Sequence, residues 1–250
     1  TMNRKFDLIY DGAVAIQAEK IVAVGTRADI LAQYDSPQVI DCSGKYVLPG
    51  LVNAHTHAPM TLLRGLADDL RLDVWLLGYM MPPEREFVTP EFCRVGTLLA
   101  CAEMIRSGVS AFADMYYFEA EVAKATAEAG LRGVLGESIL KFPSPDAVSY
   151  EDSLAYTRRY IEEWKGHPLI TPAIAPHAPY TNTDETMTLA TELALEFDVP
   201  LLIHIAETAS EVEDSVHEFG MPVVERMDHL KLFRAKTLCA HCVHIKRFEM

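Results

Sequence analysis

Six short apolar runs recur along this chain, and each ends on or next to an ionisable side chain. The runs cover residues 50–54, 109–115, 133–136, 170–175, 201–205 and 237–242. Segments with helical spacing separate them, at residues 90–107, 119–129, 150–165, 184–197 and 207–219. Continuous apolar runs are typical of parallel strands that helices cover on both faces. The alternation therefore predicts repeated βα units and an α/β fold.

The end of the first run decides between an open sheet and a barrel. A doubly wound sheet that binds a dinucleotide has a glycine-rich turn at this place, whereas this chain has Asn53-Ala54-His55-Thr56-His57. We therefore predict a (β/α)8 TIM-type barrel, of which residues 46–250 supply about six βα units. Residues 1–45 are rich in short strands and turns, with strands expected at 7–10, 13–17 and 21–24. They are predicted to form part of a small β-sandwich domain.

The ionisable side chains at the strand ends are the candidates for chemistry, because the active sites of barrels lie at this edge. These residues are His55, His57, Asp114, Glu137, His177, His204, Glu207 and His241. His55 and His57 are two positions apart, so on an extended strand both rings point to the same side. His204 adds a third nitrogen donor, and three protein ligands are typical of a catalytic zinc-type site.

Two further strand-end residues have the chemistry of proton transfer. Glu207 follows His204 by three positions, where the chain turns towards the next helix, and is predicted to act as a general acid or base. His241 is predicted to orient a nucleophile or stabilise developing charge. A bound metal ion lowers the pKa of its water to about 7, so these residues together predict metal-assisted hydrolysis.

Other candidates have an equally good structural explanation. Trp75 and Glu84 flank Pro82 and Pro83 in a segment, 81–89, that is expected to be a loop. An aromatic ring and a carboxylate can hold a sugar by stacking and by accepting its hydroxyl protons, but they can also be a core tryptophan and a surface glutamate. Asp114 can equally be a structural hydrogen-bond acceptor.

The composition limits the partners and the location. The formal net charge of −14 argues against nucleic acid and anionic membranes, whose phosphates require basic residues. The five cysteines are an odd number in a chain that needs no covalent staples, which favours a reducing compartment. No apolar run reaches the roughly 18 residues of a membrane span, and no segment resembles a signal peptide. The sequence thus predicts a soluble, cytoplasmic protein.

An ordered set of motifs resembles the amidohydrolase superfamily. The motifs are Pro49-Gly50-Leu51-Val52-Asn53-Ala54-His55-Thr56-His57, Ala58-Pro59-Met60-Thr61-Leu62-Leu63-Arg64-Gly65, Trp75, Glu84, Pro176-His177-Ala178-Pro179-Tyr180, His204-Ile205-Ala206-Glu207-Thr208 and Ala240-His241-Cys242-Val243-His244. Within that superfamily the chain is most similar to the 5-methylthioadenosine/S-adenosylhomocysteine deaminases.

The resemblance implies a role for each motif residue. His55, His57 and His204 would hold Zn²⁺ or another divalent metal such as Fe²⁺. Metal-bound hydroxide would attack C6 of an adenine nucleoside, such as 5′-methylthioadenosine, adenosine or S-adenosylhomocysteine, and release ammonia. Glu207 would protonate the purine ring, and His241 would steady the attacking hydroxide. The nucleoside would be held by residues Trp75, Glu84 and His177.

The chain departs from the family pattern in two places. Glu137 stands near the third strand, where the family usually has basic residues, so we expect a preference for nucleosides with an uncharged 5′ group. The family's aspartate at the end of the eighth strand has no counterpart before Met250. We therefore expect these residues to be part of a larger barrel, and expect the 250-residue polypeptide alone not to turn over substrate.

Two alternatives remain open from the sequence. The chain can be another amidohydrolase, such as an s-triazine or guanine-type hydrolase, or an inactive fragment that acts as a binding module. In either case the exposed edges of an unclosed sheet favour association, so we expect a homo-oligomer.

Overall fold

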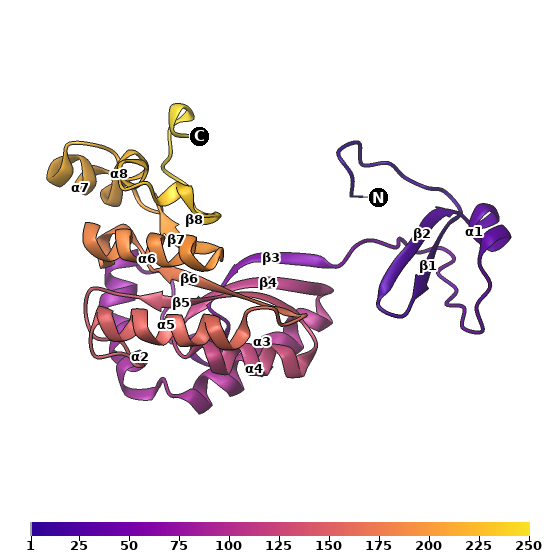
Figure 1. Ribbon diagram of the computed structural model, residues 1–250, viewed down its shortest axis with the longest axis horizontal. Helices are drawn as coiled ribbons and strands as arrows, with labels where there is room; N and C mark the ends of the chain where they lie inside the picture. Colours follow the sequence, from indigo (N-terminus) through magenta and orange to yellow (C-terminus); the bar gives the residue numbers. More distant parts are fainter. Residues whose placement is uncertain (1) are drawn as a thin grey trace. The chain divides into compact units, whose positions relative to one another are not determined.

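The computed structural model describes residues 2–250, so position 1 of the predicted small domain lies outside the described residues. The chain divides into two compact units, one ending at Gly50 and the other spanning Leu51–Met250. In the first unit, β1 (Gly12–Gln17) and β2 (Lys20–Thr26) form an antiparallel pair, followed by α1 (Arg27–Gln33) (Figure 1).

Two of the three strands predicted in this first unit are present, and the third is absent. The strands expected at 13–17 and 21–24 are confirmed by β1 and β2, but the strand expected at 7–10 is wrong. Phe6 and Asp11, which flank that segment, both have positive φ angles, of 52° and 45°. Such left-handed residues bend the backbone at both ends of the segment, which interrupts an extended chain.

The second unit contains a parallel sheet of six strands in the order β3-β4-β5-β6-β7-β8 (Figure 1). The strands are β3 (Leu51–Thr56), β4 (Val109–Tyr116), β5 (Arg132–Ile139), β6 (Ile170–Pro176), β7 (Leu201–Ile205) and β8 (Thr237–His241). Each predicted strand is confirmed within a few residues. The sheet is a nearly closed barrel, as expected for repeated βα units whose neighbouring strands pair in chain order.

Helices connect these strands. The α-helices are α2 (Met81–Phe87), α3 (Pro90–Arg106), α4 (Glu119–Ala129), α5 (Tyr150–Trp164), α6 (Asp184–Phe197), α7 (Ala209–Phe219) and α8 (Val223–His229). Shorter turns are η1 (Ala58–Leu63), η2 (Val74–Met80), η3 (Pro179–Thr181), η4 (Leu232–Arg234) and η5 (Arg247–Glu249). The predicted start of α3 is confirmed, since the Thr89 hydroxyl accepts a hydrogen bond from the Phe92 amide.

The loop predicted at 81–89 is wrong, because most of it is helix. A π-helical turn, η2, runs directly into α2, whose first turn contains Pro82 and Pro83. The amides of a first helical turn have no partner within the helix, so proline is tolerated there. The helix α8 was also absent from the sequence-based expectation.

The two faces of the barrel strands pack against different partners. A small inner cluster consists of Ala113, Met115, Ala173, Ala175 and Leu202. The larger cluster lies between the strands and the helices and includes Phe112, Leu135 and Ile174. Since side chains alternate along a strand, His204 shares the inner face with Leu202, two positions earlier. The strand register thus determines which strand-end residues point into the barrel.

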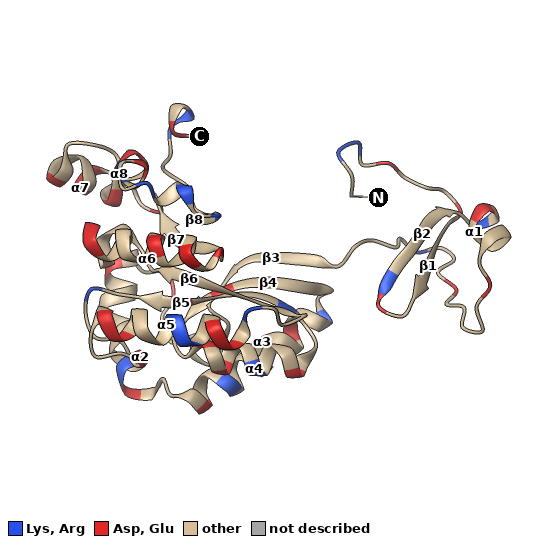
Figure 2. Ribbon diagram, viewed as in Figure 1, with Lys and Arg blue, Asp and Glu red and all other residues tan. Residues whose placement is uncertain are grey.

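Most charged residues lie on the helices and connecting loops, as Figure 2 shows, while the apolar core consists of strand residues and of buried residues on the helices. All five cysteines are free thiols. Among the described residues, no helix is both long and apolar enough to cross a membrane.

Candidate metal centre

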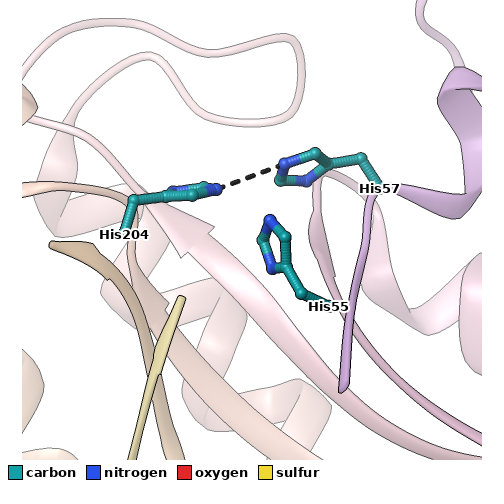
Figure 3. Close-up of side chains that lie close together, drawn as sticks. All are labelled: His55, His57 and His204. Carbon is teal, nitrogen blue, oxygen red and sulfur yellow. Dashed lines mark hydrogen bonds between the residues drawn. The ribbon is translucent and has the colours of Figure 1, made fainter. Parts of the chain in front are cut away.

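Three histidine side chains meet at the ends of two barrel strands (Figure 3). His55 and His57 come from the end of β3, and His204 comes from β7. One ligand nitrogen from each lies within 4.8 Å of the others. The His55 ring centroid is 4.9 Å from those of both His57 and His204. The geometry predicted from the two-residue spacing is therefore present.

Backbone carbonyls orient two of these rings. His57 Nδ1 lies 2.6 Å from the carbonyl oxygen of Met115, and His204 Nδ1 lies 2.8 Å from that of His177. A carbonyl only accepts hydrogen bonds, so each Nδ1 carries a proton, and in the neutral form of each ring Nε2 keeps its lone pair. This is the arrangement that orients histidine ligands in metal sites.

The two lone pairs face each other. His57 Nε2 and His204 Nε2 are 3.2 Å apart, as the dashed line in Figure 3 indicates. When both rings are neutral and protonated at Nδ1, neither Nε2 has a proton to donate, and a cation that accepts both lone pairs satisfies them. The donor set of three imidazoles fits a divalent transition metal such as zinc.

Burial keeps the surrounding imidazoles neutral. It lowers the pKa of His55 to about 4, with further lowering from His57 and His241, and it lowers the pKa of His204 as well. His177, whose ring centroid lies 4.7 Å from that of His204, has its pKa lowered by burial to about 3. Neutral imidazole is the form that coordinates metals.

Glu207 and His241 lie beside this histidine cluster. The Glu207 Oε2 atom is 3.6 Å from His241 Nε2, and both side chains are partly exposed. The His241 ring stacks on that of His204 at a centroid distance of 5.2 Å. A partly exposed carboxyl group beside the histidine cluster has the position of a proton donor or acceptor.

Comparison with known proteins identifies the family. The model of the Amidohydrolase family matches residues 46–250. The chain belongs to the amidohydrolase family. A second model, the bacterial imidazolonepropionase-like composite domain, matches residues 12–35 of this amidohydrolase.

Two similar curated relatives of this amidohydrolase are deaminases by name. The 5-methylthioadenosine/S-adenosylhomocysteine deaminase of Syntrophobacter fumaroxidans is 45% identical over 99% of this chain and 56% of its own length. The corresponding deaminase 1 of Syntrophus aciditrophicus is 43% identical over 94% of this chain and 53% of its own length. The chain thus spans about half the length of the curated relatives it matches.

Solved structures agree on the barrel fold. An adenosine deaminase from Xanthomonas campestris with bound zinc has a TM-score of 0.88 and 38% identity, covering 96% of this chain and 54% of that one. A guanine deaminase from C. acetobutylicum has a TM-score of 0.85 at 23% identity, covering 96% and 59% of the two chains. The second likeness concerns the fold alone.

Two of the strand-end candidates lie on the other face of the amidohydrolase barrel. Asp114 pairs with Thr56 in the sheet register, and both are one position out of phase with His55 and His57. The Asp114 Oδ1 atom accepts hydrogen bonds from the Thr56 hydroxyl and, at 2.6 Å, from the Ala58 amide. Asp114 is therefore a structural acceptor that holds the backbone on both sides of His57.

Glu137 does not face the mouth of the barrel, so the premise of the expected 5′ preference is wrong. Its carboxyl group is 1% exposed and accepts the Glu119 amide at 2.9 Å. Burial, together with Asp146 and Glu119, raises its pKa. A buried carboxyl group that does not face the mouth of the barrel does not meet a substrate carboxylate, so Glu137 gives no reason to prefer an uncharged 5′ group.

Trp75 and Glu84, the two candidates near Pro82 and Pro83, have different surroundings in the structure. Glu84, on α2, is 5% exposed, so its interpretation as a surface residue is wrong. The Tyr116 hydroxyl donates to Glu84 Oε1 at 2.7 Å, and burial raises the pKa of Glu84 despite this bond. Trp75 is half-buried and lines a cavity of about 720 Å³ together with His57.

Tyr116 and Glu211 are residues that the sequence reasoning missed. Tyr116 ends β4 next to His57, at a centroid distance of 6.3 Å, and orients Glu84. Glu211 accepts the backbone amides of Ala206 and Glu207. A signal for Glu211 existed in the spacing Thr208-x-x-Glu211, which is the pattern of a helix capping box.

Proposed function

We propose that this amidohydrolase hydrolyses the 6-amino group of an adenine nucleoside, such as 5′-methylthioadenosine, adenosine or S-adenosylhomocysteine. The observation that carries the proposal is the convergence of His55, His57 and His204 beside Glu207 and His241. The 43–45% identity to proteins curated as 5-methylthioadenosine/S-adenosylhomocysteine deaminases supports the substrate class.

His55, His57 and His204 are proposed to hold one divalent metal, zinc or a similar ion such as Fe²⁺. The zinc in the similar adenosine deaminase from Xanthomonas campestris favours zinc. When bound, such an ion lowers the pKa of a coordinated water so that a strong nucleophile exists at neutral pH. The carbonyls of Met115 and His177 keep two of the rings in the tautomer that such binding needs.

The remaining residues act on the nucleoside. Glu207 is proposed to deliver a proton to the purine ring nitrogen next to C6, which makes that carbon more electrophilic. His241, 3.6 Å from Glu207, is proposed to accept a hydrogen bond from the attacking nucleophile and so orient it. Proton delivery and orientation contribute only when the groups lie within hydrogen-bond reach of the reacting atoms.

The sugar is proposed to lie between Glu84 and Trp75. The Glu84 carboxyl group, oriented by Tyr116, is proposed to accept hydrogen bonds from the ribose hydroxyls, with Trp75 packed against the ring. His177 is proposed to line the nucleoside pocket. Because Glu137 is buried away from the mouth of the barrel, it gives no preference for an uncharged 5′ group. Methylthioadenosine and S-adenosylhomocysteine are therefore equal candidates for the substrate. Homo-oligomerisation and a cytoplasmic location stay predictions from the sequence.

The alternative is a hydrolase of the same family with another substrate. Guanine deaminases and triazine hydrolases share the fold at 18–24% identity. Ribose recognition distinguishes them, because guanine and triazines have no sugar. Loss of the Glu84 carboxylate should therefore matter for a nucleoside and be neutral for a substrate without ribose.

The test is ammonia release by the complete gene product, loaded with zinc, from adenosine, methylthioadenosine, S-adenosylhomocysteine, guanine and an s-triazine. We expect turnover of at least one adenine nucleoside. Glu84→Ala should raise its KM by roughly 10- to 100-fold, since one hydrogen bond to a charged group is lost. The exposed Glu86→Ala on the same helix serves as the control. Turnover confined to guanine or triazine, unaffected by Glu84→Ala, would overturn the proposal.

A further inference from the structure

The turn that carries Glu207 rests on a buried carboxyl group. Glu211, in the first turn of α7, is 8% exposed. Its Oε1 atom accepts the Ala206 amide at 3.0 Å, and its Oε2 atom accepts the Glu207 amide at 2.8 Å. Both oxygens of one side chain thus bind two consecutive peptide groups at the exit of β7.

This turn needs such support because of its backbone conformation. Ala206 has a φ of 52°, in the left-handed region that is unfavourable for a residue with a Cβ atom. Its side chain is fully buried. On the carbonyl side, Ala206 accepts the His244 amide at 2.9 Å, and Ile205 accepts the Cys242 amide at 3.0 Å. Glu211 completes the set by binding the amide side of the same turn.

The contacts of Glu211 extend beyond those of an ordinary capping box. In a capping box, the glutamate at the third helical position accepts the amide of the N-cap residue, here Thr208. The Glu211 carboxyl group interacts with the Thr208 amide, and it also accepts hydrogen bonds from the amides of Ala206 and Glu207, the two residues before the N-cap. The effect of these two bonds therefore falls on the segment that carries the proposed proton donor, outside the helix itself.

We propose that Glu211 is a positioning residue that fixes the backbone of Glu207 so that its carboxyl group reaches the substrate. The inference rests on the proposed function for the role of Glu207, but the hydrogen-bonded clamp itself does not. A displacement of about 1 Å at a reacting group costs on the order of 100-fold in rate. A clamp on both amides before the N-cap limits such displacements.

The kinetic test uses Glu211→Ala and Glu211→Gln in the complete, zinc-loaded gene product. We expect Glu211→Ala to lower kcat by roughly 10- to 100-fold with little change in KM. Glu211→Gln keeps one acceptor oxygen and should give a smaller loss. Glu213→Gln removes a charge from an exposed site on the same helix and should leave kcat unchanged.

A double-mutant cycle separates positioning from general support of the fold. In a Glu207→Gln background the proton donor is already gone, so Glu211→Ala should lower kcat by less than about twofold. Zinc content should equal that of the wild type in every variant. An equal loss in both backgrounds, or a loss of zinc, would overturn the positioning role.

Amide hydrogen exchange tests the clamp without any activity. In Glu211→Ala the amides of Ala206 and Glu207 should exchange at least tenfold faster, while those in the middle of α7 keep their protection. Unchanged exchange at both amides would refute the clamp. If Glu211→Ala does not fold, the exchange rates of the same two amides are compared between Glu211→Gln and the wild type, because glutamine has nearly the same volume as glutamate. A wild-type protein that deaminates no nucleoside would refute the proposed function. Amide exchange at Ala206 and Glu207 would still show whether Glu211 holds this turn.

Discussion

His204 is the residue whose substitution tests the proposed metal site most directly, because both of its ring nitrogens make contacts there. Its Nδ1 atom binds the carbonyl of His177, and its Nε2 atom lies 3.2 Å from that of His57. Loss of a group that only orients a metal ligand costs about 10- to 100-fold in metal affinity. The His204 ring is itself one of the three proposed ligands, so its loss should cost at least as much. We expect His204→Ala to bind zinc at least about 100-fold more weakly. Zinc titration and metal content check this, and the exposed His229→Ala should match the wild type.

Glu119 is a buried carboxyl group next to a second buried carboxyl group, Asp114. Glu119 is 0% exposed and Asp114 is 1% exposed. Burial first, and then the neighbouring Asp114, raise the pKa of Glu119 well above its ordinary value. The folded state therefore binds this proton more tightly than the unfolded state does. The resulting stability is fully present below the unfolded pKa of about 4.3 and is lost as the pH rises.

The variant Glu119→Gln should escape this loss, because an amide does not ionise and can donate to Asp114. We expect it to be more stable than the wild type at pH 8, by at least about 1 kcal/mol, and to differ little near pH 4. Urea unfolding at the two pH values measures the difference. Glu162→Gln, exposed on α5, should show no such pH-dependent gain. A Glu119→Gln protein that is less stable at pH 8 would contradict the prediction.

At the scale of elements, α3 contacts the segment that follows His57 almost backbone to backbone. A Cβ atom on Gly96, in α3, would lie 2.4 Å from the carbonyl oxygen of Pro59, in η1. Gly96→Ala therefore has to push the helix and η1 apart. We expect a loss of roughly 1–3 kcal/mol in unfolding free energy, together with weaker zinc binding.

Gly78→Ala, in η2, is the control for the Gly96→Ala variant. Nothing lies within 4 Å of the Cβ position at Gly78, in η2, so the variant should keep the wild-type zinc affinity. Chemical unfolding and zinc titration compare the two alanine variants. Equal stability and equal zinc affinity in both would show that α3 does not hold the β3 end in place.

The elements themselves were largely predictable, because their signals are local. Apolar runs and caps such as Thr89 located the barrel strands and five helices within a few residues. The errors also have local causes. Pro82 and Pro83 were read as marking a loop, yet they occupy the first turn of α2, and the segment 7–10 lacks a strand between its two bends.

At the scale of the molecule, the sheet of the described residues leaves β3 and β8 at its edges. Leu51 and Val52 on β3, an edge strand, are 58% and 71% exposed. Such edges favour association between copies. We expect the 250-residue chain to self-associate, and expect Val52→Lys to weaken the association about tenfold by removing roughly 1.5 kcal/mol of apolar burial.

Light scattering across a range of concentrations measures this association. Val148→Lys, at an exposed position outside the strands, should associate like the wild type. A chain that is monomeric at all concentrations would show that the exposed edge has no part in assembly.

The sequence alone determined the βα pattern, the inward direction of His55 and His57, and the meeting of three histidines. These follow from periodicity along the chain and from the rule that parallel strands end at one edge. Only the tertiary structure decided that Asp114 and Glu137 point towards the helices, that Tyr116 binds Glu84, and that Glu211 clamps the turn of Glu207. These contacts depend on strand register, burial and the conformation of a turn. Packing of the whole barrel sets those quantities, and local sequence patterns do not encode them.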